Sequence, residues 1–562
     1  MIDQTKTDTC ATAPVRSVSL GLRALVGGSL LVLASALGTG AQAQSLGPLV
    51  QITQGDPFST CTADDVRSQE AAYDSILYPG TSIEPWVAVD PTNSARLLVV
   101  HQQDRWNNGG ARGLAGNVST DGGSHWSDTI PTDVSRCTGG DFSRASDPWV
   151  AFSPLGTAFF FSLVLDPAQP TSPFGARHSG MLVSRSSDHG QTWGPPTTLI
   201  RDNTPHVLND KNSISADPIA PGRVYAVWDR LHVFPLPGDT DADKLLAIND
   251  GVEIARELVD GLRTAAAGGA PLFKFAFTGP TFLSMTADDG DSWSTAVPIY
   301  QPGTNAQTIN NLVVVLPTGD VLDFFTNIGN TGALNIGYIR STDQGSHWSG
   351  PTFASDIHVV GVVTPDSHQR VRDAAILYSV AVDPASGALY LAWQDDRFSG
   401  NTTCMTSTGS RPIDGIVFSQ SLDGGVTWST PVQINKTPAN ANPCRQQAFI
   451  PAVVAAGDGT VVVTYYDFRN DTGAGGFEAA DYFALFCHPS MPAPCSNGAN
   501  WGNEKRLTSA SFNILDAPVA GGHFLGDYMG LAASGLKNVV PVFGIATGPN
   551  VTATLTRRIT LP

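Results

Sequence analysis

An eight-residue pattern, Ser/Thr-x-Asp-x-Gly-x-x-Trp, occurs five times in this chain and constrains its fold more than any other feature. In such a stretch the Asp carboxylate accepts backbone N–H groups of a tight turn, and the Gly supplies the positive φ that the turn needs. The Trp covers the apolar underside of the turn, and the Ser or Thr hydroxyl caps it. The copies span residues 119–126, 186–193, 286–293, 341–348 and 421–428. Five self-supporting hairpin turns predict a protein built from repeated β-units.

These copies resemble the Asp boxes, or BNR repeats, of the sialidase-like β-propellers. The resemblance covers residues 46–562. It implies an all-β propeller of four-stranded antiparallel blades, with each box between the third and fourth strands, on the face away from the binding site. The boxes indicate the fold but not an activity, so functional residues are expected on the opposite face.

A second repeat, two extended runs joined by an Asp-Pro, Pro-x-Gly or Asp-Gly turn, predicts the inner strands of each blade. Its seven versions begin near Glu84, Asp147, Asn212, Asn310, Asp373, Ala448 and Asp527. We therefore expect seven blades, with the six blades of the sialidases as the alternative. Residues 47–53 resemble the strand after the fifth box, residues 431–435. This similarity predicts that the N-terminal strand completes the last blade, which removes free sheet edges.

The first 43 residues predict an export signal. Lys6, Arg16 and Arg23 precede the apolar run 24–37, and an Ala-Gln-Ala cleavage site ends at Ala43. The run is shorter than the ~20 residues that a spanning helix needs, which disfavours a membrane anchor. No later stretch predicts a span. We therefore expect a secreted or periplasmic protein whose propeller occupies residues 44–562.

The net charge limits the classes of binding partner, and the cysteine count indicates disulfides. A formal net charge of -18 disfavours binding to nucleic acid or to an anionic membrane. We expect a monomer without a cofactor. The cysteines after the export signal permit three disulfides in an oxidising compartment, and metal binding is disfavoured because no Cys-x-x-Cys or histidine cluster accompanies them. We expect the pairs Cys61–Cys137, Cys404–Cys444 and Cys487–Cys495, the last of which closes a short loop.

The third unit carries an insertion over residues 231–280. Within it, residues 244–264 have apolar side chains at helical spacing, which predicts one amphipathic helix packed on the propeller near the functional face. A passive insertion is favoured over a lid. Asp239, Asp241 and Asp243 resemble the start of a calcium loop, but Lys244 stands where such a loop needs Gly, which favours an acidic surface turn.

An acid and an arginine recur at the ends of the second strands, on the face opposite the boxes. The arginines of these pairs are Arg105, Arg230, Arg397 and Arg469, and two further arginines, Arg144 and Arg372, precede first strands. The recurrence favours structural ion pairs between blades. The alternative is that some of these guanidinium groups bind an anionic ligand, since guanidinium grips a carboxylate with two N–H groups.

The resemblance also implies catalytic roles. Sialidases use an arginine cluster for the substrate carboxylate, a tyrosine nucleophile assisted by a glutamate, and an aspartate as acid/base. The candidates are Tyr528, Asp527, Asp147 and Glu84. The sialidase motif Phe/Tyr-Arg-Ile/Leu-Pro is replaced here by residues 83–86, Ile-Glu-Pro-Trp.

The expected function is a glycan-directed exo-glycosidase for acidic sugars. The alternatives are a non-catalytic propeller that binds glycans or proteins, and a polysaccharide lyase or other hydrolase on the same scaffold. We expect a glycan or glycoconjugate as the partner and no metal at the site.

Overall fold

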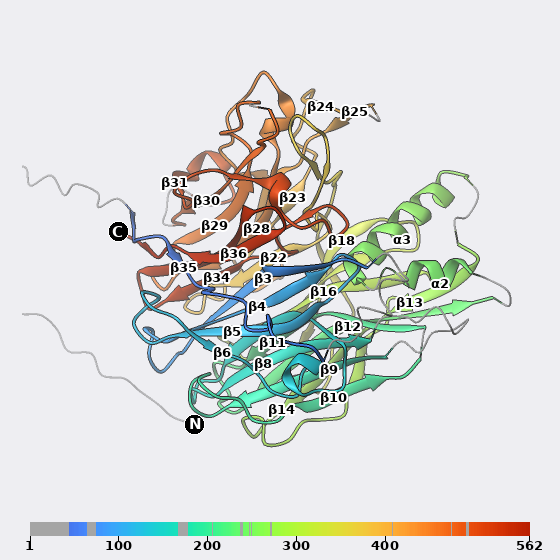
Figure 1. Cartoon of the computed structure of the whole chain (residues 1–562), viewed down its shortest axis with the longest axis vertical. Helices are drawn as coiled ribbons and strands as arrows, with labels where there is room; N and C mark the ends of the chain where they lie inside the picture. Colours follow the sequence, from blue (N-terminus) through green and yellow to red (C-terminus); the bar gives the residue numbers. More distant parts are fainter. Residues whose placement is uncertain are drawn as a thin grey trace, which may run out of the picture. The chain divides into compact units, whose positions relative to one another are not determined.

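The computed structural model describes residues 44–562 apart from 64–74, 167–177, 205, 237–239, 247, 249, 270–272, 407–408, 474 and 490–493. The predicted export signal, residues 1–43, lies outside the described residues. The described chain is built mainly of β-strands, with α-helices α2 (Asp241–Leu246) and α3 (Gly251–Ala266) in the third unit (Figure 1). None of the described helices is both long and apolar enough to cross a membrane.

The strands form sets in which an inner strand is followed outward by antiparallel neighbours, as four-stranded blades require. The first two sets are β3 (Leu77–Val89), β4 (Leu97–Trp106), β5 (Ala111–Ser119) and β6 (Ser127–Thr129), then β7 (Arg144–Phe152), β8 (Ala158–Asp166), β9 (His178–Ser186) and β10 (Thr197–Asp202). The next two are β11 (Val207–Ala216), β12 (Val224–Pro235), β14 (Thr281–Thr286) and β15 (Val297–Tyr300), then β16 (Ala306–Val315), β17 (Val321–Ile328), β18 (Leu334–Ser341) and β19 (Thr352–Asp356).

The C-terminal half continues the pattern. Its sets are β22 (Tyr378–Val382), β23 (Leu389–Asp395), β26 (Gly415–Ser421) and β27 (Val432–Gln433), then β28 (Ala448–Ala455), β29 (Val461–Asp467), β30 (Ala479–Cys487) and β31 (Gly502–Arg506), and finally β34 (Gly530–Ser534), β35 (Asn538–Gly548) and β36 (Val551–Thr556). Strand β2 (Val50–Gln51) pairs with β36, so the prediction that an N-terminal strand completes the last set is confirmed. Strand β1 (Ser45–Leu46) also pairs with the C-terminal strand β37 (Ile559–Thr560).

The inner strands lie side by side in chain order. The cycle runs β3, β7, β11, β16, β22, β28 and β34, and β34 returns to β3. The described chain is therefore an all-β propeller. Hydrogen bonds join neighbouring sets into sheets of eight and nine strands, so the number of blades stays a prediction.

The five Asp boxes lie where third strands end and fourth strands follow, as the resemblance implies. In the first box the Ser119 hydroxyl accepts from the Gly123 N–H at 2.9 Å and donates to Asp121 Oδ1 at 2.9 Å, and the Trp126 indole donates to the Gly123 carbonyl. The hydroxyl-to-carboxylate and Gly-to-hydroxyl bonds recur in the other four boxes. Each box is thus stabilised within its own eight residues.

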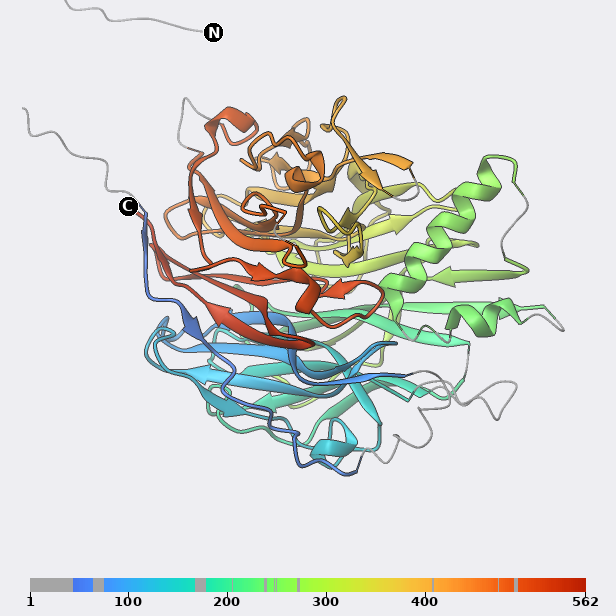
Figure 2. The same cartoon turned by 45° about the horizontal axis from the view of Figure 1, so that its top comes forward.

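The insertion differs from the single predicted helix. It contains α2, then α3 at a new start, then strand β13 (Phe275–Gly279). The break arises because the Asp250 side chain caps α3 by accepting from the Glu253 N–H. Figure 2 shows α3 in green beside the strands. The residues Val252, Ala255, Val259 and Leu262 of the predicted apolar pattern pack into the core, which confirms the amphipathic pattern over α3, and Ile254 and Leu258 join them. In the segment that resembles the start of a calcium loop, Asp239 lies outside the described residues, and α2 begins at Asp241.

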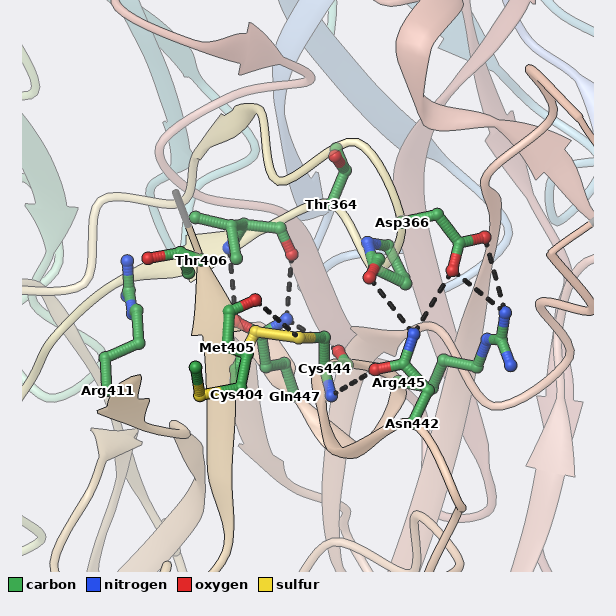
Figure 3. The surroundings of a disulfide bond; sticks show 12 residues. Thr364, Asp366, Cys404, Met405, Thr406, Arg411, Asn442, Cys444, Arg445 and Gln447 are labelled. Atoms are coloured by element: carbon green, nitrogen blue, oxygen red, sulfur yellow. Dashed lines mark hydrogen bonds and ion pairs between the residues drawn. A yellow bond between two sulfur atoms is a disulfide. The ribbon is translucent and has the colours of Figure 1, made fainter. Parts of the chain in front are cut away.

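All three predicted disulfides, Cys61–Cys137, Cys404–Cys444 and Cys487–Cys495, are confirmed. The pair Cys404–Cys444 ties strand β24 (Thr403–Thr406) to the short helix Pro443–Gln446 (Figure 3). Around it, Asn442 Oδ1 accepts from the Cys444 N–H, and Arg445 forms an ion pair with Asp366 at 3.0 Å. The disulfide therefore holds two loop segments that polar contacts also join.

Replacing both Cys404 and Cys444 by Ser should lower the free energy of unfolding by about 2–4 kcal/mol, because the bond closes a long loop in the unfolded chain. Urea unfolding monitored by tryptophan fluorescence measures the loss. The matched control is the double substitution Cys487→Ser and Cys495→Ser, whose sequence separation of 8 is far shorter than the 40 of the first pair. A loss in the control that equals or exceeds the first would contradict the loop-length explanation.

Candidate functional site

A bulge recurs at the same place in the inner strands and aims their side chains at the centre. In β3, β7, β11, β16 and β28 the pairing with the next strand skips two residues, and the first skipped residue has a positive φ. These residues are Glu84 (φ 52), Asp147 (φ 49), Lys211 (φ 42), Asn310 (φ 64) and Ile450 (φ 50). Bulges re-aim side chains, and non-glycine residues keep this backbone only where their surroundings hold it. The bulge explains how charged residues of separate strands converge.

Three carboxylates surround the Lys211 ammonium group. Its Nζ lies 2.8 Å from Asp527 Oδ2, 3.3 Å from Asp147 Oδ2 and 3.5 Å from Glu84 Oε1. All four side chains are at most 5% exposed. Glu84 also accepts from the Gln102 amide and from the Asp527 backbone N–H. The structure thus brings together three of the four predicted catalytic residues around a lysine.

A second layer of charges joins this cluster through Asp527. Arg372 donates from Nε to Asp527 Oδ1 at 2.9 Å and from Nη2 to Asp527 Oδ2 at 2.5 Å. Arg372 also holds Asp250, and Arg105 reaches the same Asp250 at 2.7 Å. We call the seven residues Glu84, Asp147, Lys211, Asp527, Arg372, Arg105 and Asp250 the central charge cluster. Each buried charge in it has a partner of opposite sign, which is the condition for burying charge at all.

The surroundings in the cluster shift the pKa values of Glu84 and Asp527 in opposite directions. Burial raises the pKa of Glu84 to about 8, although Lys211 acts in the opposite direction. Burial also opposes ionisation of Asp527, but Arg372 and Lys211 overcome it and lower the pKa of that carboxyl. Burial alone would lower the pKa of Lys211, but Asp147, Asp527 and Glu84 raise it. These opposite shifts make Glu84 the more readily protonated of the two carboxyl groups, an arrangement suited to acid/base chemistry.

A cavity of about 280 Å³ lies along the centre of the inner strands. Every strand of the inner cycle contributes to its wall, which includes Trp86, Trp149, Leu312, Ala452 and Leu531. Polar residues at its lining include Asp527, Tyr528, Asn310, Asp373 and Gln394. The Trp86 and Trp149 rings stack at 3.6 Å between centroids. This volume and mixture of aromatic and polar groups suit one sugar unit.

Tyr528, the predicted nucleophile, lies against the tryptophan pair. Its ring makes edge contacts with Trp149 at 5.2 Å and Trp86 at 6.0 Å, and Lys211 Nζ lies 5.3 Å from its centroid. The hydroxyl donates to the Pro148 carbonyl at 3.3 Å. Burial raises the pKa of Tyr528, and the negative charges of Glu84 and Asp147 raise it further. The phenol is therefore protonated, and a nucleophilic role for it stays a prediction.

The six predicted arginines divide into two groups. Arg105 and Arg372 belong to the central charge cluster. The others contact groups outside it: Arg230 pairs with Asp202, Arg397 with Asp395, Arg469 with Asp467 and Glu504, and Arg144 bonds to Asn108 and lies over the Trp106 ring. Arg230 joins two sets, because Asp202 belongs to the preceding set, whereas Arg397 and Arg469 pair with acids of their own set. The predicted ion pair between blades is thus present at Arg230 but not at Arg397 and Arg469. Arg230 and Arg105 do not pair with the aspartates that precede them in sequence.

The described residues contain one group with metal-ligand geometry, formed by His368, Cys404 and Cys444. Its two sulfur atoms are bonded to each other, so they are not thiolate ligands. The absence of a metal at the site stays an expectation.

Sequence reasoning missed Lys211 and Asp250 as members of the site. Lys211 occupies the same bulge position as Glu84 and Asp147, and aligning the repeats by that position would have found it. Asp250 carries no such signal, because it lies in the insertion and reaches the centre through the packing of α3.

No protein-family model matches the chain, and no curated protein matches it. Among solved structures, it is similar to the Hadza microbial sialidase Hz136, with 14% identity over 81% of this chain and 75% of that one, at a TM-score of 0.40. An α-L-arabinanase of Penicillium chrysogenum has 11% sequence identity over 91% of this chain and 98% of that one, at a TM-score of 0.40. The leech intramolecular trans-sialidase has 13% sequence identity over 85% of this chain and 68% of that one, at a TM-score of 0.39. These values are too low to transfer an activity, and the propeller assignment rests on the strand pairing.

Proposed function

We propose that this protein is an exported, glycan-directed propeller that acts as an exo-glycosidase on a terminal sugar bound in the central cavity. The observation that carries the proposal is a pair of buried carboxyl groups at the centre: Asp527 lines that cavity, and Glu84 lies directly behind it and accepts from the Asp527 backbone N–H. Their pKa values are shifted in opposite directions, up for Glu84 and down for Asp527. Glu84 acts as the proton donor, and ionised Asp527 stabilises the positive charge that develops on the sugar. The three disulfides are typical of proteins outside the cytosol.

The sugar stacks on the aromatic wall of the cavity. Trp86, Trp149 and Tyr528 offer apolar faces, while Asn310 and Asp373 offer hydrogen-bond partners for hydroxyl groups. The expected preference for acidic sugars depends on arginines that bind the sugar's carboxylate. Of the six predicted arginines, Arg105 and Arg372 belong to the central charge cluster. Both already hold the Asp250 carboxylate. An acidic sugar at this point therefore competes with Asp250.

The second candidate is a non-catalytic propeller that binds glycans. It is favoured by the burial and mutual pairing of the cluster and by the hydrogen bond from the Tyr528 hydroxyl to a backbone carbonyl. In that function the charges serve to hold the inner strands, and the cavity alone binds the ligand.

The test is hydrolysis of a panel of 4-methylumbelliferyl glycosides by the chain without residues 1–43. The panel contains N-acetylneuraminate and glucuronate as acidic sugars, and α-L-arabinofuranoside and β-galactoside as neutral ones. We expect turnover of at least one glycoside, with the wild type and the Tyr528→Phe variant assayed together to locate the nucleophile. No turnover across the panel, combined with glycan binding by calorimetry, would replace the enzyme with the binding protein.

A further inference from the structure

The Asp250 carboxylate sits where two buried arginines would otherwise hold an anionic ligand. Arg372 donates from Nη1 to Oδ2 at 2.6 Å and from Nη2 to Oδ1 at 3.0 Å, so it grips both oxygens. Arg105 adds a third bond, from Nη2 to Oδ2 at 2.7 Å. Both arginine side chains are at most 2% exposed. Convergent guanidinium groups on one carboxylate are the usual means of recognising an acidic ligand.

The two arginines and the carboxylate come from different parts of the chain. Arg105 belongs to β4 of the first set, and Arg372 to the short strand β21 (Arg370–Arg372). Asp250 belongs to the insertion and caps α3. The propeller framework thus supplies an anion-binding pair, and the inserted segment supplies the anion.

Tight packing keeps Asp250 in this position. A Cβ added to the next residue, Gly251, would lie 1.8 Å from Asp210 Oδ2, so the start of α3 rests directly on the bulge of β11. The apolar residues Ile254, Leu258 and Leu262 anchor the helix in the core. Displacing Asp250 would expose these side chains to water, which is unfavourable. Asp250 is therefore a resident group and not a transient occupant.

Space for a ligand adjoins the arginine pair. A cavity of about 320 Å³ is lined by Asp250 and Arg372 together with Glu253, Arg256 and Arg370. Removing the Asp250 carboxylate would leave Arg105 without that carboxylate partner and Arg372 with Asp527 as its remaining close partner, so the vacated position beside this cavity would attract a small anion.

We infer that Asp250 is an internal carboxylate ligand that determines the charge specificity of the cavity of about 320 Å³ beside the arginine pair. It occupies the Arg105–Arg372 pair, so the wild-type protein takes ligands without a negative charge at that point. The consequence for substrate class, that uncharged sugars are accepted, rests on the proposed glycan-directed function. The occupancy of the arginine pair does not depend on it.

The test is chemical rescue of Asp250→Ser by acetate. Serine keeps the helix cap but vacates the carboxylate position. We expect the melting temperature of Asp250→Ser to be several degrees higher in sodium acetate than in sodium chloride at equal ionic strength and pH. Asp250→Asn fills the position without a charge, and Asp260→Ser removes an exposed aspartate of the same helix. Acetate should not raise the melting temperature of Asp250→Asn, of Asp260→Ser or of the wild type.

A second measurement compares N-acetylneuraminate with its uncharged methyl ester by calorimetry. Asp250→Ser should bind the acid at least tenfold more tightly than the ester, and the wild type should not distinguish them. The inference is overturned if acetate brings no gain specific to Asp250→Ser, or if the wild type binds the acid as tightly as the variant. Should Asp250→Ser fail to fold in chloride, refolding in acetate supports the inference and its failure there overturns it. Melting requires no glycan, so a failed glycosidase assay leaves this result unaffected.

Discussion

Replacing Lys211 by Met is expected to lower the free energy of unfolding by about 3–5 kcal/mol, the cost typical of breaking a buried charge network by removing one partner. The ammonium group has oxygens of Glu84, Asp147 and Asp527 within 3.5 Å, and all of these side chains are buried. Without it, the Asp147 carboxyl loses its ammonium partner in a medium that solvates charge poorly, and Asp527 keeps Arg372 alone of its two cationic partners. Since whole domains are stable by only about 5–15 kcal/mol, this one substitution removes a large share. Urea unfolding measures the loss.

Lys244→Met is the matched control, because Lys244 makes an exposed ion pair with Asp241 and its side chain is 73% exposed. Exposed pairs contribute about 0–1 kcal/mol, so this variant should unfold almost as the wild type does. Equal losses in the two variants would mean that the cluster around Lys211 is not the stabilising element described here.

Replacing Glu84 by Gln is expected to lower glycosidase turnover about 10²–10⁴-fold, the usual contribution of a proton donor. Gln keeps the shape of the protonated acid but has no proton to transfer. Because burial raises the pKa of Glu84 to about 8, wild-type turnover should fall as pH rises through that value, and this limb should be absent from the residual activity of the variant. Stopped assays of a 4-methylumbelliferyl substrate between pH 5 and 10 measure both.

The same pKa makes a prediction for stability. Glu84 binds a proton in the folded chain at pH values where the unfolded chain has released it, from its ordinary value of 4.5 up to about 8. Its contribution to stability is therefore fully present below pH 4.5 and is lost as pH rises through about 8. Glu84→Gln should remove this slope. Glu257→Gln, an exposed site on α3, is the control and should change neither turnover nor slope. Unchanged turnover in Glu84→Gln would exclude Glu84 as the donor without affecting the fold.

Much of the fold could be predicted because its signals are local. Each Asp box forms its hydrogen bonds within eight residues, so residues such as Asp121 and Trp126 specify a turn wherever they occur together. The inner hairpins and the closing strand β2 were predicted from strand patterns, and all three disulfides were paired correctly. The helix break at Asp250 was missed, since an apolar helical spacing continues across it.

The site was only partly predictable. The antiparallel order of the strands in a blade placed Glu84, Asp147, Asp527, Arg105 and Arg372 on the face opposite the boxes, and the structure brings all five into the central charge cluster. It does not bring Arg144, Arg230, Arg397 or Arg469 there. The propeller face on which a residue lies follows from the direction of its strand, but the partner of a long charged side chain depends on which strand lies beside it. Arg230, for example, pairs with Asp202 of the preceding set.

The repeated β-units, their turns and the acids and arginines at one end of them could be predicted from the sequence, because these features depend on near neighbours in the chain. Which of those charges meet depends on how the strand sets and the insertion pack together. Lys211 joins carboxylates from three strand sets, and Asp250 reaches Arg105 and Arg372 from an insertion. Such pairings depend on bulges and on helix packing that bring together residues far apart in sequence, 145 positions for Arg105 and Asp250 and 122 for Asp250 and Arg372, and no local pattern encodes which of them meet.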